Sequence, residues 1–242
     1  MKELSQEQIT YIDDYLQFHK VKYWDIRMEL LDHIVKTVEA KMKNNISFDD
    51  ALGIAHKNFG NSMKIVHNTG VEYSIFSNGS GYQNLMVQKR KETNKKYRNQ
   101  YFREVLNLFK SPKSIALICI LILFEYILMD NFSLELFKRI ILILILIPSI
   151  ILIFLSFRQS FIKNKSINLE YANFYSGFST LLIFPLFNFI SGIDFFQNSD
   201  LNKTLLLAIT SILYILLTYA GFKVFMACQK EYNHIQNKLK KT

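Results

Sequence analysis

The second half of the chain carries long apolar runs without charge, and these constrain the fold more than any other feature. Residues 140–157, 171–193 and 204–222 contain no Asp, Glu, Lys or Arg over 18, 23 and 19 positions. About 20 mainly apolar residues cross the hydrocarbon core of a bilayer as one helix. A fourth run, 114–134, is interrupted by two acidic residues. The sequence therefore predicts four transmembrane helices, at about 114–134, 140–157, 171–193 and 204–226.

The rest of the chain divides by charge and composition. The 242 residues provide for one small soluble domain and one bundle, and only 8 Gly and 3 Pro are present. This scarcity favours continuous helices over the interrupted helices that often form transport sites. The predicted fold class is all-α. Its parts are a small cytosolic three-helix domain over 1–70, a linker or hinge over 71–88, a basic amphipathic juxtamembrane helix over 89–113, four transmembrane helices within 114–228 and a basic cytosolic tail over 229–242.

The distribution of Lys and Arg predicts the orientation. Residues 1–88 hold 9 Lys or Arg against 11 Asp or Glu, whereas residues 89–113 hold 9 against 2. Basic residues gather on the cytoplasmic side of membrane spans. The 158–170 loop and the tail are also richer in basic residues than the two remaining loops. We expect a multi-pass protein with both termini in the cytosol. No apolar core of a signal peptide is present in residues 1–22, so no cleavable signal peptide is expected.

Residues 5–60 have the periodicity of three short amphipathic helices. Ser5 and Gln8 form a capping-box pattern before the first helix, and the second is predicted over about 23–43. Ser47 is placed to cap the third helix, and Gly60 to terminate it. A domain of about 60 residues is marginally stable alone, so we expect it to pack against a partner, another copy or the juxtamembrane helix.

The same segment carries a family resemblance. Its residues read E-L-L-D-H-I at 29–34, S-F-D-D-A at 47–51 and N-F-G at 58–60. This order resembles the layout of bacterial permease-prefix domains, also called HAAS-type α-helical signalling domains. Asn44 and Asn45 stand where that layout has a glycine-containing turn. The resemblance implies a cytosolic head in a bacterial cytoplasmic (inner) membrane protein. It also implies a cytosolic partner, either a PadR-type transcription regulator or an ABC-type transporter component, and it implies no catalytic residue.

Four polar residues on the second helix are the predicted partner-binding residues: Glu29, Asp32, His33 and Lys36. Glu29 and His33 share a helical face, and Asp32 is spaced to pair with Lys36. A metal site or a general base would need further ligands or partners at fixed spacing, which the other histidines do not provide. We therefore favour an interface, with pH or ligand sensing by His33 as the alternative.

Glu125 is the predicted intramembrane polar residue. Ionisable groups at membrane depth usually face the bundle interior, a cavity or an interface. Two interpretations are open: a structural or end-of-span placement near the outer headgroups, and a functional polar contact. The second would suit a transporter or permease subunit, for which a homo-oligomer is expected.

The basic segment before the first span is predicted to lie on the membrane surface. Basic residues interleaved with aromatic ones can also bind nucleic acid. Beside a span, however, the same composition favours anionic lipid headgroups, at about 1 kcal/mol for each Lys or Arg near the surface. Direct nucleic-acid binding is therefore not predicted. The membrane-surface residues are Lys89, Arg90, Lys91, Lys95, Lys96, Arg98 and Arg103.

The sequence shows no enzyme signature. It contains no G-x-S-x-G, no P-loop and no zinc-protease spacing, and Cys119 and Cys228 are interpreted as packing residues. We predict no catalytic residue, no metal and no cofactor. The leading functional hypothesis is a non-enzymatic membrane regulatory or scaffold protein whose head binds a partner. The alternative is a transporter or permease subunit that uses a polar site around Glu125.

Overall fold

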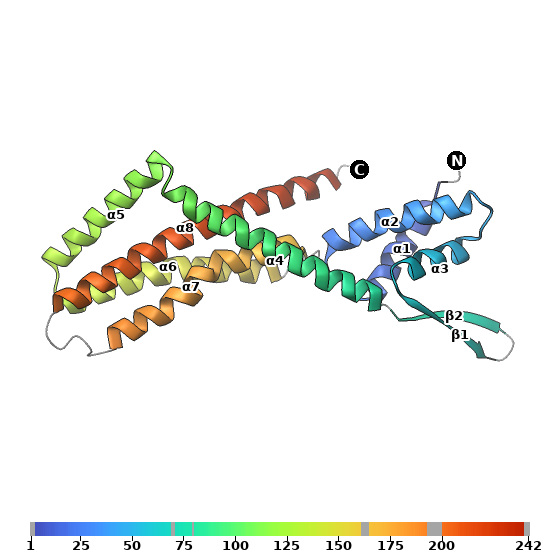
Figure 1. Cartoon of the computed structure of the whole chain (residues 1–242), viewed down its shortest axis with the longest axis horizontal. Coiled ribbons are helices and arrows are strands. Elements are labelled where there is room, and N and C mark those ends of the chain that lie inside the picture. The colour runs from blue at the N-terminus through green and yellow to red at the C-terminus, as the bar shows by residue number, and fades with distance from the viewer. Residues whose placement is uncertain (1–2, 69–70, 79, 161–164, 193–199, 240–242) are drawn as a thin grey trace. The chain divides into compact units, whose positions relative to one another are not determined.

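The computed structural model describes residues 3–68, 71–78, 80–160, 165–192 and 200–239 (Figure 1). The chain forms two compact units. The first, called the head here, comprises Met1–Thr93 together with Asn164–Ile167. The second, called the bundle, comprises Asn94–Lys163 and Asn168–Thr242. Each unit has a core of its own and is described separately.

The head is built on three helices, α1 (Gln6–Phe18), α2 (Trp24–Met42) and α3 (Phe48–Asn58). Their apolar stripes meet in a core in which side chains of all three helices are at most 3% exposed. Burial of apolar side chains supplies most of the stability of such short helices. These core residues are Ile12 and Leu16 of α1, Ile26, Leu30, Ile34 and Val38 of α2, and Ala51, Leu52 and Ala55 of α3.

The helix ends form as the sequence predicts. Ser5 and Gln8 make a reciprocal capping box at α1, and the Ser47 hydroxyl accepts a hydrogen bond from the backbone N–H of Asp50 at α3. Gly60 follows α3 with a φ of 76°, a left-handed conformation that glycine adopts without strain. Asn45 has a φ of 61°, so an asparagine takes the left-handed position in the turn where the resembling family has glycine.

A strand and the start of a helix occupy residues 71–78 and 80–88, within the range for which the sequence predicted a linker or hinge. Strands β1 (Ser62–Asn68) and β2 (Val71–Asn78) pair antiparallel in a two-stranded sheet. Helix α4 (Ser80–Leu108) begins directly afterwards. The 71–76 sequence V-E-Y-S-I-F is rich in the β-branched and aromatic residues that favour strands.

The start of α4 is fixed to the head by Gly81. A Cβ atom at this position would lie 1.9 Å from the carbonyl oxygen of Phe59, so only glycine permits the approach. The Gly81 N–H donates to Asn61 Oδ1 at 2.9 Å, and Asn61 Nδ2 donates to the His56 carbonyl at 3.1 Å. This glycine therefore joins two helices closely, where the sequence suggested a flexible hinge.

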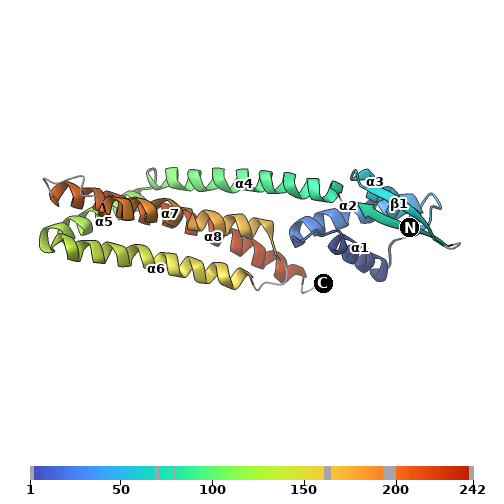
Figure 2. The same ribbon diagram turned by 90° about the horizontal axis from the view of Figure 1, so that it is seen from below.

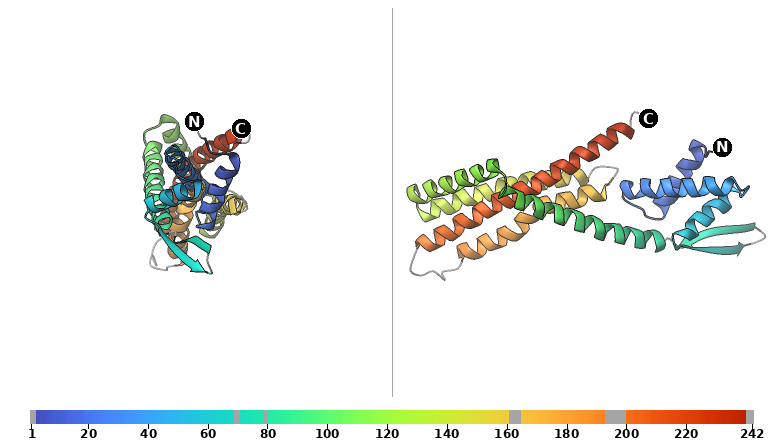
Figure 3. Two further views of the ribbon diagram at one scale, coloured as in Figure 1. Left: turned by 90° about the vertical axis from the view of Figure 1, so that its right-hand side faces the viewer. Right: turned by 45° about the horizontal axis from the view of Figure 1, so that its top comes forward.

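The bundle contains α5 (Pro112–Asn131), α6 (Leu134–Ser160), α7 (Ile167–Gly192) and α8 (Asp200–Leu239). All four are long and apolar enough to cross a membrane, which confirms the predicted helical fold class and a multi-pass membrane protein with four candidate spans. Helices α6, α7 and α8 run side by side (Figures 2 and 3). Helices α6 and α8 extend beyond their predicted spans at both ends, whereas α5 ends at Asn131, before the predicted end at 134. The 40 residues of α8 measure about 60 Å at 1.5 Å per residue.

Candidate functional site

Helix α8 is the centre of polar contacts in the bundle. A stripe of inward residues recurs along it with alternating steps of four and three residues, the seam of a left-handed helix packing. The stripe places small and polar side chains against the other bundle helices, where small residues allow close approach and hydroxyls bond across helices. Its members are Leu207, Ser211, Tyr214, Thr218, Gly221, Phe225 and Cys228.

Glu125 of α5 lies inside the bundle against this stripe. It is only 2% exposed, and its Oε1 lies 2.5 Å from the Oγ of Ser211. Ser211 Oγ is also 2.9 Å from the carbonyl of Ala208, and a hydroxyl has one proton to donate to these two acceptors. Glu125 Oε2 has no hydrogen-bond partner among the described residues. The carboxyl thus occupies the bundle interior, and its hydrogen bond to Ser211 crosses from α5 to α8.

A cluster of hydroxyls joins α6, α7 and α8 at one level. Tyr214 Oη lies 2.9 Å from Ser149 Oγ and donates to the Ile145 carbonyl at 2.9 Å. Thr180 Oγ1 lies 3.4 Å from both hydroxyls. Ser149 Oγ also donates to the Ile145 carbonyl at 2.7 Å. We interpret this cluster as the polar contact that holds α6, α7 and α8 together at this level.

Contacts of α7 with α8 continue toward the end of the bundle at which α7 begins. Ser179 Oγ and Thr218 Oγ1 are 2.7 Å apart. At Gly221 an added Cβ would lie 2.7 Å from the Tyr175 carbonyl oxygen and 2.8 Å from Ser176 Cα. The two backbones therefore approach each other as closely as a glycine allows.

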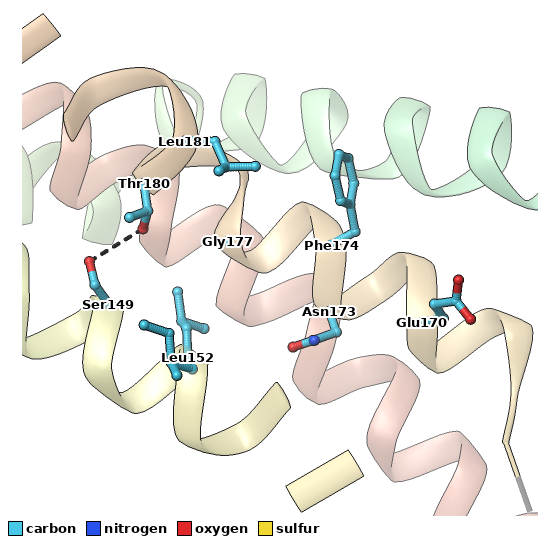
Figure 4. Close-up of a pocket in the computed structure, with 9 residues that line it drawn as sticks. Ser149, Leu152, Glu170, Asn173, Phe174, Gly177, Thr180 and Leu181 are labelled. Atoms are coloured by element: carbon cyan, nitrogen blue, oxygen red, sulfur yellow. Dashed lines mark hydrogen bonds between the residues drawn. The ribbon is translucent and has the colours of Figure 1, made fainter. Parts of the chain in front are cut away.

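Helices α6 and α7 also enclose a groove of about 420 Å³, shown in Figure 4. Its walls are mainly apolar, and polar side chains stand at both ends of it. Ser149 and Thr180 lie at one end, and Glu170 and Asn173 lie at the other, near the start of α7. The apolar lining comes from Leu152, Ile153, Phe174, Leu181 and the backbone at Gly177.

The structure places the four predicted partner-binding residues on the outside of α2. Asp32 and Lys36 form the expected ion pair at 2.6 Å, and both side chains are more than half exposed. Glu29 pairs with Lys89 of α4 at 2.7 Å. His33 is exposed. Exposed ion pairs contribute about 0.5 kcal/mol or less, so Asp32 and Lys36 remain available to a partner at little cost.

A different histidine pair lies in the head core. His56 is fully buried and His19 is 7% exposed, and their rings pack with those of Tyr15 and Tyr82. The Tyr15 hydroxyl is hydrogen-bonded to Nδ1 of His56. Burial lowers the pKa of His19 below its ordinary value of 6.5 and raises the pKa of Tyr82 to about 12. His19 is therefore uncharged in the folded head at neutral pH.

Within the head, α2 is hydrogen-bonded to the residues that open α7. Asp25, in the first turn of α2, accepts hydrogen bonds from the Ser166 hydroxyl at 2.8 Å and from the Ile167 N–H at 3.3 Å. The backbone N–H of Trp24 donates to the Lys165 carbonyl at 2.9 Å. We call this set of contacts the latch. A carboxylate that accepts from the first N–H groups of a helix acts as an N-cap, and here α2 supplies it to α7.

The predicted membrane-surface residues of α4 divide into two groups. Lys89 pairs with Glu29, and Arg90 lies 6.0 Å from the ring centre of Tyr23, so both contact α2. The remaining five are exposed: Lys91, Lys95, Lys96, Arg98 and Arg103.

The apolar residues of α4 also divide. Tyr97 and Tyr101 are buried in the bundle, where Tyr97 Oη donates to Cys228 Sγ at 3.1 Å. By contrast, Phe102, Leu106 and Phe109 are 49 to 60% exposed. An exposed face that combines basic and aromatic residues keeps the composition expected at a headgroup surface.

Within the described ranges no three His, Cys, Asp or Glu side chains gather as metal ligands would. No family model matches the chain, and neither a curated protein nor a solved structure does. The resemblance to permease-prefix domains stays a prediction.

Sequence reasoning missed the latch and the groove. Asp25 was an unremarkable acidic residue in a first helical turn, and its partners lie about 140 positions away. Gly177 offered the only local signal for the groove, because a glycine inside an apolar helix costs about 1 kcal/mol relative to alanine and needs a reason.

Proposed function

We propose that this chain is a non-enzymatic, multi-pass membrane regulatory protein whose head binds a cytosolic protein partner. The observation that carries the proposal is the latch. Asp25 of the head accepts hydrogen bonds from Ser166 and Ile167, and Ile167 is the first residue of the candidate span α7. A soluble helical domain that caps a membrane helix is suited to exchange a signal with it. Both termini face the cytosol on the basis of the Lys and Arg distribution.

The latch makes the start of α7 depend on the state of α2. When the latch is formed, the Asp25 carboxylate accepts hydrogen bonds from the Ser166 hydroxyl and the Ile167 N–H at the start of α7. Its negative charge also interacts favourably with the positive end of the helix dipole. A partner that displaces the first turn of α2 removes this cap. The expected change is local fraying of α7 at its first turn, which a two-state regulatory element requires.

The outward faces of α1 and α2 offer the surface for the partner. His33, Asp32 and Lys36 are exposed on α2, and Tyr11 and Phe18 of α1 are 52% and 78% exposed. Tyr11 and Phe18 are seven positions apart and so share one face of α1. Exposed aromatic residues beside charged ones are typical of binding surfaces. The family resemblance favours a PadR-type regulator or an ABC-type transporter component as the partner.

The test is site-specific photocrosslinking of the full chain in the membrane of living bacteria. A photoreactive residue is placed at Phe18 or at His33, and as a matched control at Asp49, which is exposed on α3. We expect one cytosolic protein to be captured from the first two positions and not from the third. Capture of lipid alone, or of the same proteins from all three positions, would contradict the proposal.

The latch is tested separately with Asp25→Ala, which removes both oxygens that accept from Ser166 and Ile167. The control is Asp49→Ala, the same change at an exposed position. We expect faster amide exchange over 165–169 in the first variant alone, and a changed yield of the crosslinked partner. An exchange rate equal to that of the control would show that Asp25 does not cap α7.

A second candidate function, a transporter or permease subunit, rests on Glu125. Its buried carboxyl has one oxygen without a partner among the described residues, and the Ser211 proton is shared between two acceptors. A carboxyl that gains and loses a proton in such a site suits proton-coupled transport. Glu125→Gln would abolish a pH-gradient-driven flux in reconstituted vesicles without lowering expression. Proton uptake equal to that of the wild type would exclude this role.

A further inference from the structure

We propose that the groove between α6 and α7 binds one acyl chain of a phospholipid whose headgroup carries a primary amine. This proposal concerns a ligand of the bundle and does not depend on a protein partner of the head. The groove has a volume of about 420 Å³, and Figure 4 shows its apolar walls with Glu170 and Asn173 near one end. The position of the groove, its length, its glycine and its charge all favour such a lipid.

The position of the groove points to a lipid. All of its lining residues fall within two candidate spans, Leu134–Leu155 and Ile167–Ile190. The groove is open on one side, and Ile153 and Leu181, which line it, are 68% and 63% exposed. Surface of this kind within a span contacts acyl chains and not water.

The length of the groove matches one leaflet. Glu170 and Leu181 are eleven residues apart on α7, which corresponds to about 16 Å at 1.5 Å per residue. Half of a bilayer core of ~30 Å is about 15 Å. A lipid whose chain lies against Leu181 therefore has its headgroup at the level of Glu170 and Asn173.

Gly177 lies midway along the groove and keeps it open. A Cβ added at this position would meet no atom within 4 Å, so the glycine does not serve a close contact between helices. Gly221 is the contrasting case in the same bundle, because a Cβ added there would lie under 3 Å from the α7 backbone. The space beside Gly177 is available to a ligand.

The polar residues at the Glu170 end of the groove favour one kind of headgroup. Glu170 contributes a carboxylate and Asn173 an amide, which together favour a hydrogen-bonding cation. The primary ammonium of an ethanolamine headgroup has three donors, whereas the trimethylated ammonium of choline has none. A phosphatidylglycerol headgroup has no ammonium to balance its phosphate, so its net charge has the same sign as that of Glu170. Glu170 is exposed, so the preference expected from this pair is modest, about threefold.

The test uses the full chain in phosphatidylcholine nanodiscs that contain one photoactivatable lipid. Phosphatidylethanolamine, phosphatidylcholine and phosphatidylglycerol are compared with the same diazirine-bearing acyl chain. The labelled peptides are mapped by mass spectrometry. We expect adducts on 152–153 and 174–181 to exceed those on the exposed α5 residues Ile120 and Leu123, and to be about threefold higher for the ethanolamine lipid.

Four variants make the test specific. Gly177→Phe fills the groove and should reduce its adducts to the α5 level, whereas Gly177→Ala should leave them unchanged. Ile153→Trp fills the groove from the exposed face of α6 and covers the case in which the first variant does not fold. Glu170→Gln should remove the preference among headgroups while keeping the adducts. Equal labelling of groove and α5 in the wild type, or no headgroup preference, would overturn the proposal.

Discussion

Two glycines of the bundle are expected to respond in opposite ways to the same substitution. At Gly221 the new methyl group would lie 2.7 Å from the Tyr175 carbonyl oxygen and 2.8 Å from Ser176 Cα. Ordinary contacts between carbon atoms are about 3.5–4.0 Å, so α7 and α8 would have to separate by roughly 1 Å. At Gly177 the methyl group would meet nothing within 4 Å. The first substitution strains a packed interface, and the second does not.

The magnitudes follow from packing and helix propensity. The clash at Gly221 is with backbone atoms, which cannot move aside as a side chain can, so the upper part of the overpacking range applies, about 2–3 kcal/mol. Replacing glycine by alanine within a helix returns about 1 kcal/mol. Gly221→Ala should therefore lower the free energy of unfolding by about 1–2 kcal/mol, while Gly177→Ala raises it by about 0.5–1 kcal/mol. For a chain of this length the two unfolding midpoints should differ by about 4–8 °C.

The chain supplies its own probe for this measurement. Cys228 is buried in the bundle and Cys119 is exposed, so in a Cys119→Ser background only Cys228 reports unfolding through a thiol-reactive fluorophore. The full chain is heated in detergent micelles and the reaction midpoint is recorded for each variant. If both variants shift the midpoint in the same direction, or if Gly221→Ala has no effect, the close approach of α7 and α8 is refuted.

Three further predictions concern the head and the hydroxyl cluster. Because folding lowers the pKa of His19, the unfolded chain binds more protons than the folded head. Head stability should therefore fall as the pH drops below about 6.5, by at most about 1.4 kcal/mol per pH unit. Denaturant titrations followed by Trp24 fluorescence measure this change. Gly81→Ala places a methyl group 1.9 Å from the Phe59 carbonyl and should destabilise the head by more than about 2 kcal/mol, read by the same titration. Tyr214→Phe removes a hydroxyl that bonds the Ile145 carbonyl and should cost about 0.6–1.7 kcal/mol in the Cys228 assay.

Local patterns in the sequence predicted the helices and their ends well. Uncharged runs depend only on length and composition, and the Ser5, Ser47 and Gly60 signals act within four residues of their own position. The strands at 62–68 and 71–78 differ from the prediction, which places a helical domain up to residue 70 and a linker or hinge over 71–88.

Contacts between distant segments were not predictable in the same way. Glu125 stood out as an ionisable group in a span, but its partner Ser211 lies 86 positions later. On α4 the sequence offered two aromatic faces, and nothing local shows that Tyr97 and Tyr101 are buried while Phe102 is exposed. Which face of a helix is covered depends on its neighbour, and that information lies in the neighbour's sequence.

The inward stripe of α8 has a mechanical consequence. Ser211 contacts α5, Tyr214 contacts α6, Thr218 contacts α7 and Cys228 contacts α4, each at a different height along one continuous helix. A neighbour that slid by a turn along α8 would lose the hydrogen bond to its own partner, because each of these four residues bonds a different helix. The bundle should therefore resist shear and yield only as a whole, so that a pulling force applied to α8 is shared by all the helices bonded to it.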